Sequence, residues 1–282
     1  MTDVTPENDP KYQALTALLR RIGPVAVAFS GGVDSTFLAA ASRDALGAEN
    51  VLLVTACSET YSQRERADSE RLAALLGLRR ITLETSELAI PAFRTNPPDR
   101  CYYCKKELFT AMHTAVATEG TFTLCDGSNA DDTGDFRPGR RALRELAVRS
   151  PLLEAGLTKD DIRRLSKSLG LPTWNKPSYA CLSSRFPYGT PITAELVERV
   201  GACEDELHRL GFEGFRVRHH GDTARIEVPA ERLADLVRDD VRRQVVERFK
   251  ALGYTYVTVD LQGYRTGSLN EVLSDDVRRS QA

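Results

Sequence analysis

The stretch VAVAFSGGVDSTFLAA, from Val25 to Ala40, combines residue types that can bind a phosphate group. Its valine-rich beginning is typical of a strand covered on both faces, and the glycines that follow allow the backbone to approach a ligand closely. Because the N–H groups that open the next helix favour an anion, the sequence predicts a phosphate site at this turn. No lysine follows the glycines, so the stretch is not a Walker loop, and an ordinary glycine-rich turn with a helix cap is the alternative.

Two of the six cysteines form a close pair, Cys101-x-x-Cys104. In a cytosolic enzyme this spacing is consistent with zinc, an iron–sulfur cluster or a redox dithiol, and two incidental cysteines are the alternative. Cys181 lies in a proline-rich loop with Lys176 and Arg185 nearby, whose positive charge favours the thiolate that a nucleophile or a metal ligand needs. A small buried side chain is the other interpretation of Cys181.

The composition excludes several classes of protein. The chain has 282 residues, 41% of them hydrophobic, and a net charge of −2, so it can form one large or two moderate globular domains. This charge gives no overall attraction to nucleic acid or to an anionic membrane. No segment approaches the ~20 apolar residues of a membrane span, and the acidic N-terminal segment lacks the pattern of a secretory signal. We therefore expect a cytoplasmic protein with no nucleic-acid or membrane partner.

Apolar strands and amphipathic helices alternate through the first two thirds of the chain. The expected elements are helix 11–23, strand 25–29 and the helix after it, strand 51–56, helix 61–76, a strand ending at 84, a helix to about 116, a strand ending near 125, and helix 157–170. This alternation predicts an α/β fold with a mostly parallel sheet and helices on both faces. Ligands of such sheets bind at the carboxyl ends of the strands.

The pattern changes in the last third, where we expect a smaller α+β domain. Its expected elements are a helix from Ile192 to about Leu210, a hairpin turning at Gly221-Asp222, a helix from Ala230 to Leu252 and a strand in YTYVTVDL. We predict two domains, 1–188 and 189–282.

The motif SGGVDS at residues 30–35 resembles the PP-loop of the ATP pyrophosphatase superfamily, which splits ATP between its α and β phosphates. The resemblance implies an adenine nucleotide alpha hydrolase-like domain that uses ATP and magnesium. In this interpretation Gly31 and Gly32 cradle pyrophosphate and Asp34 helps to place magnesium. Ser30 and Ser35 donate hydrogen bonds to the pyrophosphate.

Five motifs together resemble the LarE-type ATP-dependent sulfur transferases over nearly the whole chain. They are SGGVDS, RCYYCK, DGSNADD, KPSYACLSSRFPYG and RVRHHGDTARIEV. The resemblance implies adenylation of a carboxylate of a pyridinium dicarboxylate mononucleotide and its conversion to a thiocarboxylate, in synthesis of the nickel-pincer cofactor. In some relatives the cysteine that matches Cys181 gives up its own sulfur, and in others three cysteines hold a 4Fe-4S cluster. The presence of Cys101, Cys104 and Cys181 favours the cluster.

The same resemblance assigns further residues. It implies that Asp131 lies by the nucleotide, that Arg185 meets phosphate, and that Arg216 and Arg218 contact substrate phosphate or carboxylate. The acidic residues that can gather a metal near subunit contacts are Glu204, Glu227 and Asp235. Solvated loops and element faces are the alternatives. Relatives form hexamers, so we expect a homo-oligomer that binds a nucleotide-like small molecule.

Three other functions use part of the same pattern. A PP-loop tRNA thiolase also pairs CxxC with a third cysteine, but it needs a basic surface for RNA, which the net charge disfavours. An ATP-dependent amide synthetase has no use for three cysteines. A nucleotide sensor without catalysis gains no support from the intact Asp34 and Ser35.

Overall fold

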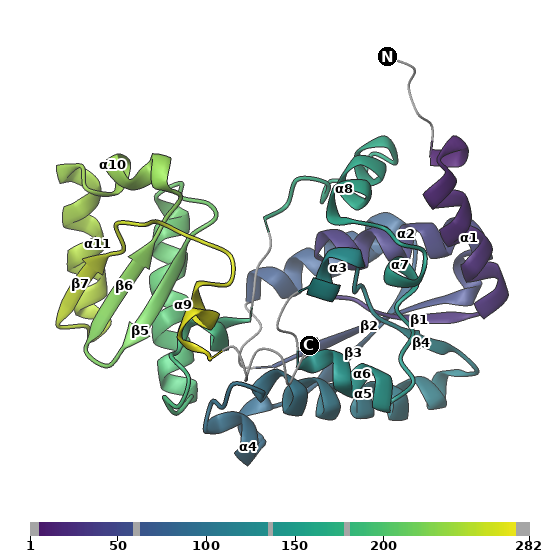
Figure 1. The fold of residues 1–282 in the computed structure, drawn as a ribbon, viewed down its shortest axis with the longest axis horizontal. Coiled ribbons are helices and arrows are strands. Elements are labelled where there is room, and N and C mark those ends of the chain that lie inside the picture. The colour runs from purple at the N-terminus through teal and green to yellow at the C-terminus, as the bar shows by residue number, and fades with distance from the viewer. Residues whose placement is uncertain (1–5, 59–62, 135–137, 178–180, 275–282) are drawn as a thin grey trace. The chain divides into compact units, whose positions relative to one another are not determined.

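The computed structural model describes residues 6–58, 63–134, 138–177 and 181–274 (Figure 1). These residues form two compact units: the first contains residues 6–85 and 101–177, and the second contains Ser86–Arg100 and 181–274. The units therefore differ from the predicted domains 1–188 and 189–282. The reason is backbone pairing, because Gly189 N donates to Asn96 O at 2.9 Å and Ile192 N donates to Arg94 O at 3.0 Å.

The first unit is built on a parallel sheet, which confirms the predicted α/β class. Within the described residues its four strands have the order β3-β2-β1-β4. The strands are β1 (Val25–Ala28), β2 (Val51–Cys57), β3 (Arg79–Glu84) and β4 (Thr123–Cys125). Near the carboxyl end of the central strand, Val27 of β1 lies beside Leu53 of β2 and Cys125 of β4. The carboxyl end of β1, where the SGGVDS motif begins, is thus flanked on both sides.

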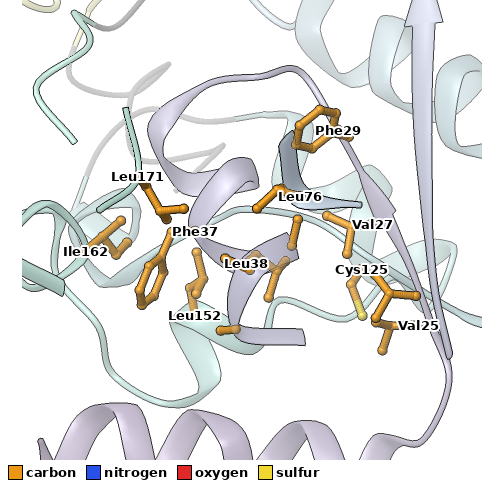
Figure 2. Close-up of a cluster of buried hydrophobic side chains, with 14 of the residues drawn as sticks. Val25, Val27, Phe29, Phe37, Leu38, Leu76, Cys125, Leu152, Ile162 and Leu171 are labelled. Atoms are coloured by element: carbon orange, nitrogen blue, oxygen red, sulfur yellow. The ribbon is translucent and has the colours of Figure 1, made fainter. Parts of the chain in front are cut away.

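Helices cover both faces of this sheet, and alternate residues of β1 point into the two layers (Figure 1). One layer contains α1 (Pro10–Ile22), α2 (Val33–Leu46), α3 (Gln63–Leu76), α7 (Pro151–Glu154) and α8 (Lys159–Ser168); the other contains α5 (Arg100–Glu119) and α6 (Gly139–Glu145). Figure 2 shows the first layer, in which Val25 and Val27 share a buried cluster with Phe37 and Leu38 of α2. A strand buried on both faces needs apolar residues at every position, which explains the VAVA sequence of β1.

Helix α8 begins at the predicted cap. Thr158 Oγ accepts a hydrogen bond from Asp161 N at 3.3 Å, and Asp161 Oδ2 accepts one from Thr158 N at 3.1 Å. The Asp161 carboxylate also accepts from Lys11 of α1 and from Arg164. Burial alone would raise the pKa of Asp161, but these donors outweigh burial and hold its pKa well below the usual range.

Asp161→Asn is expected to lower the stability of the fold at neutral pH. Because the pKa of Asp161 is lower in the folded than in the unfolded chain, its charge stabilises the fold above the unfolded pKa of about 3.9, and this contribution is lost as the pH falls toward the folded pKa. We expect a loss of about 2 kcal/mol at pH 7 that shrinks below about pH 4. Urea unfolding midpoints at several pH values measure it. The exposed neighbour Asp160 supplies the control, and an equal loss in Asp160→Asn would contradict the prediction.

The second unit has a small mixed sheet of order β5-β6-β7 in its described residues. Strands β5 (Arg216–His220) and β6 (Thr223–Glu227) form the predicted antiparallel hairpin, and β7 (Tyr256–Val259) lies parallel to β6. Gly221, at the predicted turn, has φ +65°, a backbone conformation that glycine adopts readily. Helix α9 (Ala194–Arg209) packs on β5. A smaller mixed α+β unit therefore follows the parallel sheet, as predicted.

The helix predicted from Ala230 to Leu252 is wrong as a single element. The chain forms a 3₁₀ turn (Ala230–Arg232), α10 (Leu233–Leu236) and α11 (Asp239–Ala251). Arg238, between α10 and α11, has ψ 142°, which breaks the helical path. Asp239 and Asp240 then open α11, where negative charge is favourable beside the N–H groups of a new helix.

No helix among the described residues is both long enough and apolar enough to span a membrane. Helix α5 has twenty residues, but Arg100, Lys105, Lys106 and Glu107 are charged in its first half. Its buried residues Phe109, Met112 and Val116 recur at helical spacing and face the sheet.

Candidate functional site

The predicted phosphate loop lies between β1 and α2, at the carboxyl end of the central strand. Gly31 has φ +69°, in the left-handed region that glycine tolerates best. Gly32, which has no side chain to cap the helix, is the N-cap of α2. No side chain caps the first turn of α2, so the N–H groups of this turn can donate to an anion.

The loop leaves no room for larger residues. A Cβ atom on Gly31 would lie 3.2 Å from Ser69 Cα and 3.3 Å from Leu72 Cδ1 of α3. On the opposite side, a Cβ atom on Gly127 would lie 3.2 Å from Asp34 Cβ and from Ser35 N. Both glycines are therefore fixed by close backbone packing, and the DGSN segment after β4 lies directly against the start of α2.

The two serines of the motif point toward each other. Ser30 Oγ and Ser35 Oγ are 3.2 Å apart, Gly32 N donates to Ser30 Oγ at 3.3 Å, and Ser35 Oγ donates to Gly32 O at 3.4 Å. The two serine hydroxyls and the Gly32 N–H group thus lie close together within the loop. The predicted hydrogen bonds from these hydroxyls to phosphate stay a prediction.

Asp34 is held by residues from two other segments. Lys159 Nζ, at the start of α8, lies 2.5 Å from Asp34 Oδ2, and Asn129 Nδ2 lies 3.5 Å from Asp34 Oδ1. Asp131 is exposed and lies beside them, where its carboxylate accepts from Lys159 N at 2.8 Å. The structure therefore brings Asp131 and Asp34 to the same lysine, although the nucleotide role of Asp131 stays a prediction.

A second lysine, Lys176, contacts the loop itself. Its Nζ donates to Gly31 O at 3.2 Å and to Asp68 Oδ2 of α3 at 2.9 Å. Burial raises the pKa of Asp68, but the hydrogen bond and charge of Lys176 outweigh burial, so the net shift is downward. The sequence interpretation linked Lys176 with the thiol of Cys181, whereas the structure places its ammonium group on the phosphate loop.

The three predicted thiols lie in two different units. Cys101 and Cys104 belong to the first turn of α5, one exposed and the other half-buried, and an i, i+3 pair shares one side of a helix. Cys181 is exposed and precedes the 3₁₀ turn Leu182–Arg185; its Sγ donates to Ser183 Oγ at 3.2 Å. In the described part of the chain, no three His, Cys, Asp or Glu side chains form a metal-binding group. The cluster therefore stays a prediction.

The predicted arginines of the second unit are buried. Arg185 is 1% exposed and donates through Nε and Nη2 to both oxygens of Glu204, at 2.7 and 2.8 Å. Arg218 makes the same two-bond contact with Glu227, at 3.0 and 2.8 Å, and its Nη1 donates to Ser184 O at 2.8 Å. Bidentate pairing of this kind offsets part of the cost of burying both charges.

Arg216, on the same face of β5 as Arg218, has a different environment. It is 4% exposed, and its guanidinium donates to Phe215 O at 2.6 Å and to Tyr264 Oη at 3.3 Å. Burial lowers the pKa of Arg216, and the positive charges of Arg185 and Arg218 lower it further. The three arginines thus concentrate positive charge beside the segment that follows Cys181.

The acidic residues predicted as metal ligands have arginine partners. Glu204 and Glu227 bind Arg185 and Arg218, and Asp235 Oδ2 lies 2.6 Å from Arg232 Nε. Glu204 also accepts from Val217 N at 2.9 Å. The structure brings Glu204 and Glu227 to the arginine group, and their role as metal ligands stays a prediction.

Two comparisons with known proteins place the chain in a family. A protein-family model described as NAD synthase matches residues 20–98, which include β1, the phosphate loop, α2, β2, α3 and β3. The pyridinium-3,5-bisthiocarboxylic acid mononucleotide synthase of Lactiplantibacillus plantarum is 40% identical over 266 residues, covering 94% of this chain and 95% of that protein. The chain belongs to the LarE-type sulfur transferase family. It is accordingly an ATP-dependent sulfurtransferase of the PP-loop class.

Two further proteins match over most of their lengths. An uncharacterized protein of Synechocystis sp. is 41% identical over 266 residues, which cover 94% of this chain and 99% of that protein. An uncharacterized protein of Methanocaldococcus jannaschii is 26% identical and covers 86% of this chain and 91% of its own length. The match of whole lengths means that both units of this chain have counterparts in its relatives.

Proposed function

We propose that this enzyme adenylates a carboxylate of a pyridinium dicarboxylate mononucleotide and converts it to a thiocarboxylate, as a step in nickel-pincer cofactor synthesis. The observation that carries the proposal is 40% identity with a pyridinium-3,5-bisthiocarboxylic acid mononucleotide synthase over nearly the full length of both chains. The phosphate loop at the carboxyl end of β1 supports it, because adenylation needs a site that receives pyrophosphate as it leaves.

The first step is adenylation at the phosphate loop. A carboxylate oxygen of the substrate attacks the α-phosphorus of ATP, the bond from that phosphorus to the oxygen leading to the β-phosphorus breaks, and pyrophosphate leaves. Gly32 and the first N–H groups of α2 can donate to the pyrophosphate, and Ser30 and Ser35 supply hydroxyl donors beside them. Lys159 lies next to Asp34 and adds positive charge where the pyrophosphate charge develops.

Magnesium fits this site through Asp34. Magnesium bound to a nucleotide usually has one or two protein carboxylates and takes its other ligands from phosphate and water. Asp34 opens α2 beside the loop, and its carboxylate is 25% exposed, so it can take this role. When bound, the metal neutralises phosphate charge, while Lys159 and Asn129 hold the carboxylate in place.

Where Cys181 supplies the sulfur directly, the second step uses its thiol. Its sulfur attacks the carbonyl carbon of the acyl adenylate, the carbon–oxygen bond to AMP breaks, and AMP leaves with that electron pair. If Cys181 then gives up its own sulfur, its Cα loses a proton to a base, the Cβ–S bond breaks and dehydroalanine remains with free thiocarboxylate. The exposure of Cys181 allows this contact with a small substrate.

A 4Fe-4S cluster fits the same residues by their chemistry, and we propose it as the preferred sulfur source. Cys101, Cys104 and Cys181 are not joined in disulfide bonds, and three thiolates leave one iron of such a cluster open. When bound, the cluster supplies an exchangeable sulfide, so the enzyme turns over more than once. Direct use of the sulfur of Cys181 is the alternative within the same proposal.

The buried arginines suit the anionic groups of the substrate. Arg185, Arg216 and Arg218 place three guanidinium groups near two carboxylates, Glu204 and Glu227. We propose that these arginines bind substrate phosphate or carboxylate, that Glu204, Glu227 and Asp235 gather a metal near subunit contacts, and that the protein is a cytoplasmic hexamer. Light scattering after gel filtration measures the oligomer.

The decisive experiment is intact-protein mass spectrometry after anaerobic purification and one round with ATP, magnesium and the pyridinium dicarboxylate mononucleotide. An unchanged mass, ~4 iron per chain and product formed would support the cluster, and a loss of about 34 Da would assign the sulfur to Cys181 itself. Cys101→Ala is the matched variant, because only the cluster depends on this residue. Failure of the wild-type protein to form any thiocarboxylate would overturn the proposed function.

A further inference from the structure

Asn96 combines complete burial with an unusual backbone conformation. Its side chain is 0% exposed, and its φ is +54°. Among the described residues, Ala147 is the other non-glycine residue with a positive φ. Asparagine tolerates the left-handed region better than most residues, but a buried polar amide in that conformation persists only where its surroundings fix it.

The amide of Asn96 makes three hydrogen bonds within the second unit. Its Nδ2 donates to Phe186 O at 3.3 Å and to Pro187 O at 2.7 Å, and its Oδ1 accepts from Arg100 Nη1 at 2.9 Å. The backbone carbonyl of Asn96 accepts from Gly189 N at 2.9 Å. The buried amide therefore joins two chain segments that are far apart in the sequence.

Each of these segments lies near a predicted sulfur-handling cysteine in the sequence. Arg100 is 5% exposed, stacks on the ring of Tyr188 at 5.2 Å and is the residue bonded covalently to Cys101. Phe186 follows the short 3₁₀ turn that Cys181 begins. The Asn96 side chain thus binds two backbone carbonyls of the segment that follows Cys181 and the guanidinium group of the residue before Cys101.

We propose that Asn96 is a positioning residue for sulfur transfer: through Phe186 O and Pro187 O it holds the segment that follows Cys181, without contacting substrate. This inference rests on the proposed function, in which these cysteines deliver sulfur. Reacting atoms need alignment to a few tenths of an ångström, and a shift of about 1 Å costs about 10²-fold in rate. The phosphate loop and its two lysines belong to the other unit, and no hydrogen bond described for Asn96 involves them.

Asn96→Asp separates positioning from a merely structural role. Aspartate has nearly the same shape and tolerates the left-handed backbone, and it keeps an oxygen for Arg100 while losing the donor to Phe186 and Pro187. Adenylation is measured by ATP–pyrophosphate exchange with the pyridinium dicarboxylate mononucleotide, and sulfur transfer by thiocarboxylate formed in one round. We expect exchange close to the wild-type rate and thiocarboxylate formation reduced about 10²-fold.

Asn50→Asp is the matched control. Asn50 Nδ2 also donates to a backbone carbonyl, Leu46 O at 2.9 Å, but this contact closes the end of α2 and touches neither cysteine segment. Asn50→Asp should leave the ratio of thiocarboxylate formation to ATP–pyrophosphate exchange unchanged. If Asn96→Asp fails to fold, Asn96→Gly keeps the left-handed backbone, removes all three side-chain bonds and gives the same comparison.

The measurements distinguish failure of the positioning role of Asn96 from failure of the proposed function. Equal losses of exchange and thiocarboxylate in the Asn96 variants, or thiocarboxylate formation at the wild-type rate, would overturn the positioning role. Absence of thiocarboxylate from the wild-type protein would instead contradict the proposed function. Loss of sulfur transfer with intact exchange supports the role of Asn96.

Discussion

Cys181→Ser is expected to abolish thiocarboxylate formation while leaving adenylation intact. Serine keeps the size of the side chain at the start of the Leu182–Arg185 turn but has no sulfur to transfer, to bind iron or to attack the adenylate. We expect thiocarboxylate to fall at least about 10³-fold, the size of loss that follows removal of a covalent nucleophile. ATP–pyrophosphate exchange should persist, because the phosphate loop does not contain this residue.

The control for this prediction is a cysteine with no access to substrate. Cys203 lies in the same unit, on the buried face of α9, and burial raises the pKa of its thiol to about 12. Cys203→Ala should therefore form thiocarboxylate, with at most a loss of stability from the cavity it leaves. Normal thiocarboxylate formation by Cys181→Ser would remove both sulfur mechanisms at once.

Much of the first unit could be predicted from the sequence because its signals are local. The apolar run of β1, the glycines after it and the Thr158–Asp161 capping box each specify a short segment by neighbouring residues alone. The same holds for the hairpin at Gly221. The break at Arg238 lacks any such signal, since no glycine or proline marks it, and the predicted single helix was wrong there.

The site contacts that the sequence did not predict join residues that are far apart in the chain. Lys159 lies 125 positions from Asp34, and Lys176 lies 145 positions from Gly31, so no motif spacing could join them. Asn96 gives no sequence signal either, because the two carbonyl groups that accept from its amide, Phe186 O and Pro187 O, lie 90 and 91 positions away. For Lys159 the available clue was the capping box, which located the start of α8 but not the strand end that it faces.

Asp34→Asn is expected to abolish most adenylation while the protein stays folded. Asparagine has the same shape but loses the negative charge that pairs with Lys159 and that the proposed magnesium would use. We expect ATP–pyrophosphate exchange to fall at least about 10²-fold, as when a group that stabilises developing charge is removed. The magnesium concentration needed for half-maximal exchange should also rise, which a general loss of folded protein would not produce.

Asp44→Asn tests whether the effect depends on position rather than on charge. Asp44 lies on the same helix α2, but near its opposite end, where it accepts from Tyr12 Oη at 2.8 Å and pairs with Arg43. Loss of its charge removes a structural contact and leaves the phosphate loop intact, so magnesium dependence should match the wild type. If Asp34→Asn keeps both the exchange rate and the magnesium dependence, the nucleotide phosphates bind elsewhere, and the SGGVDS turn is only a glycine-rich connection between β1 and α2.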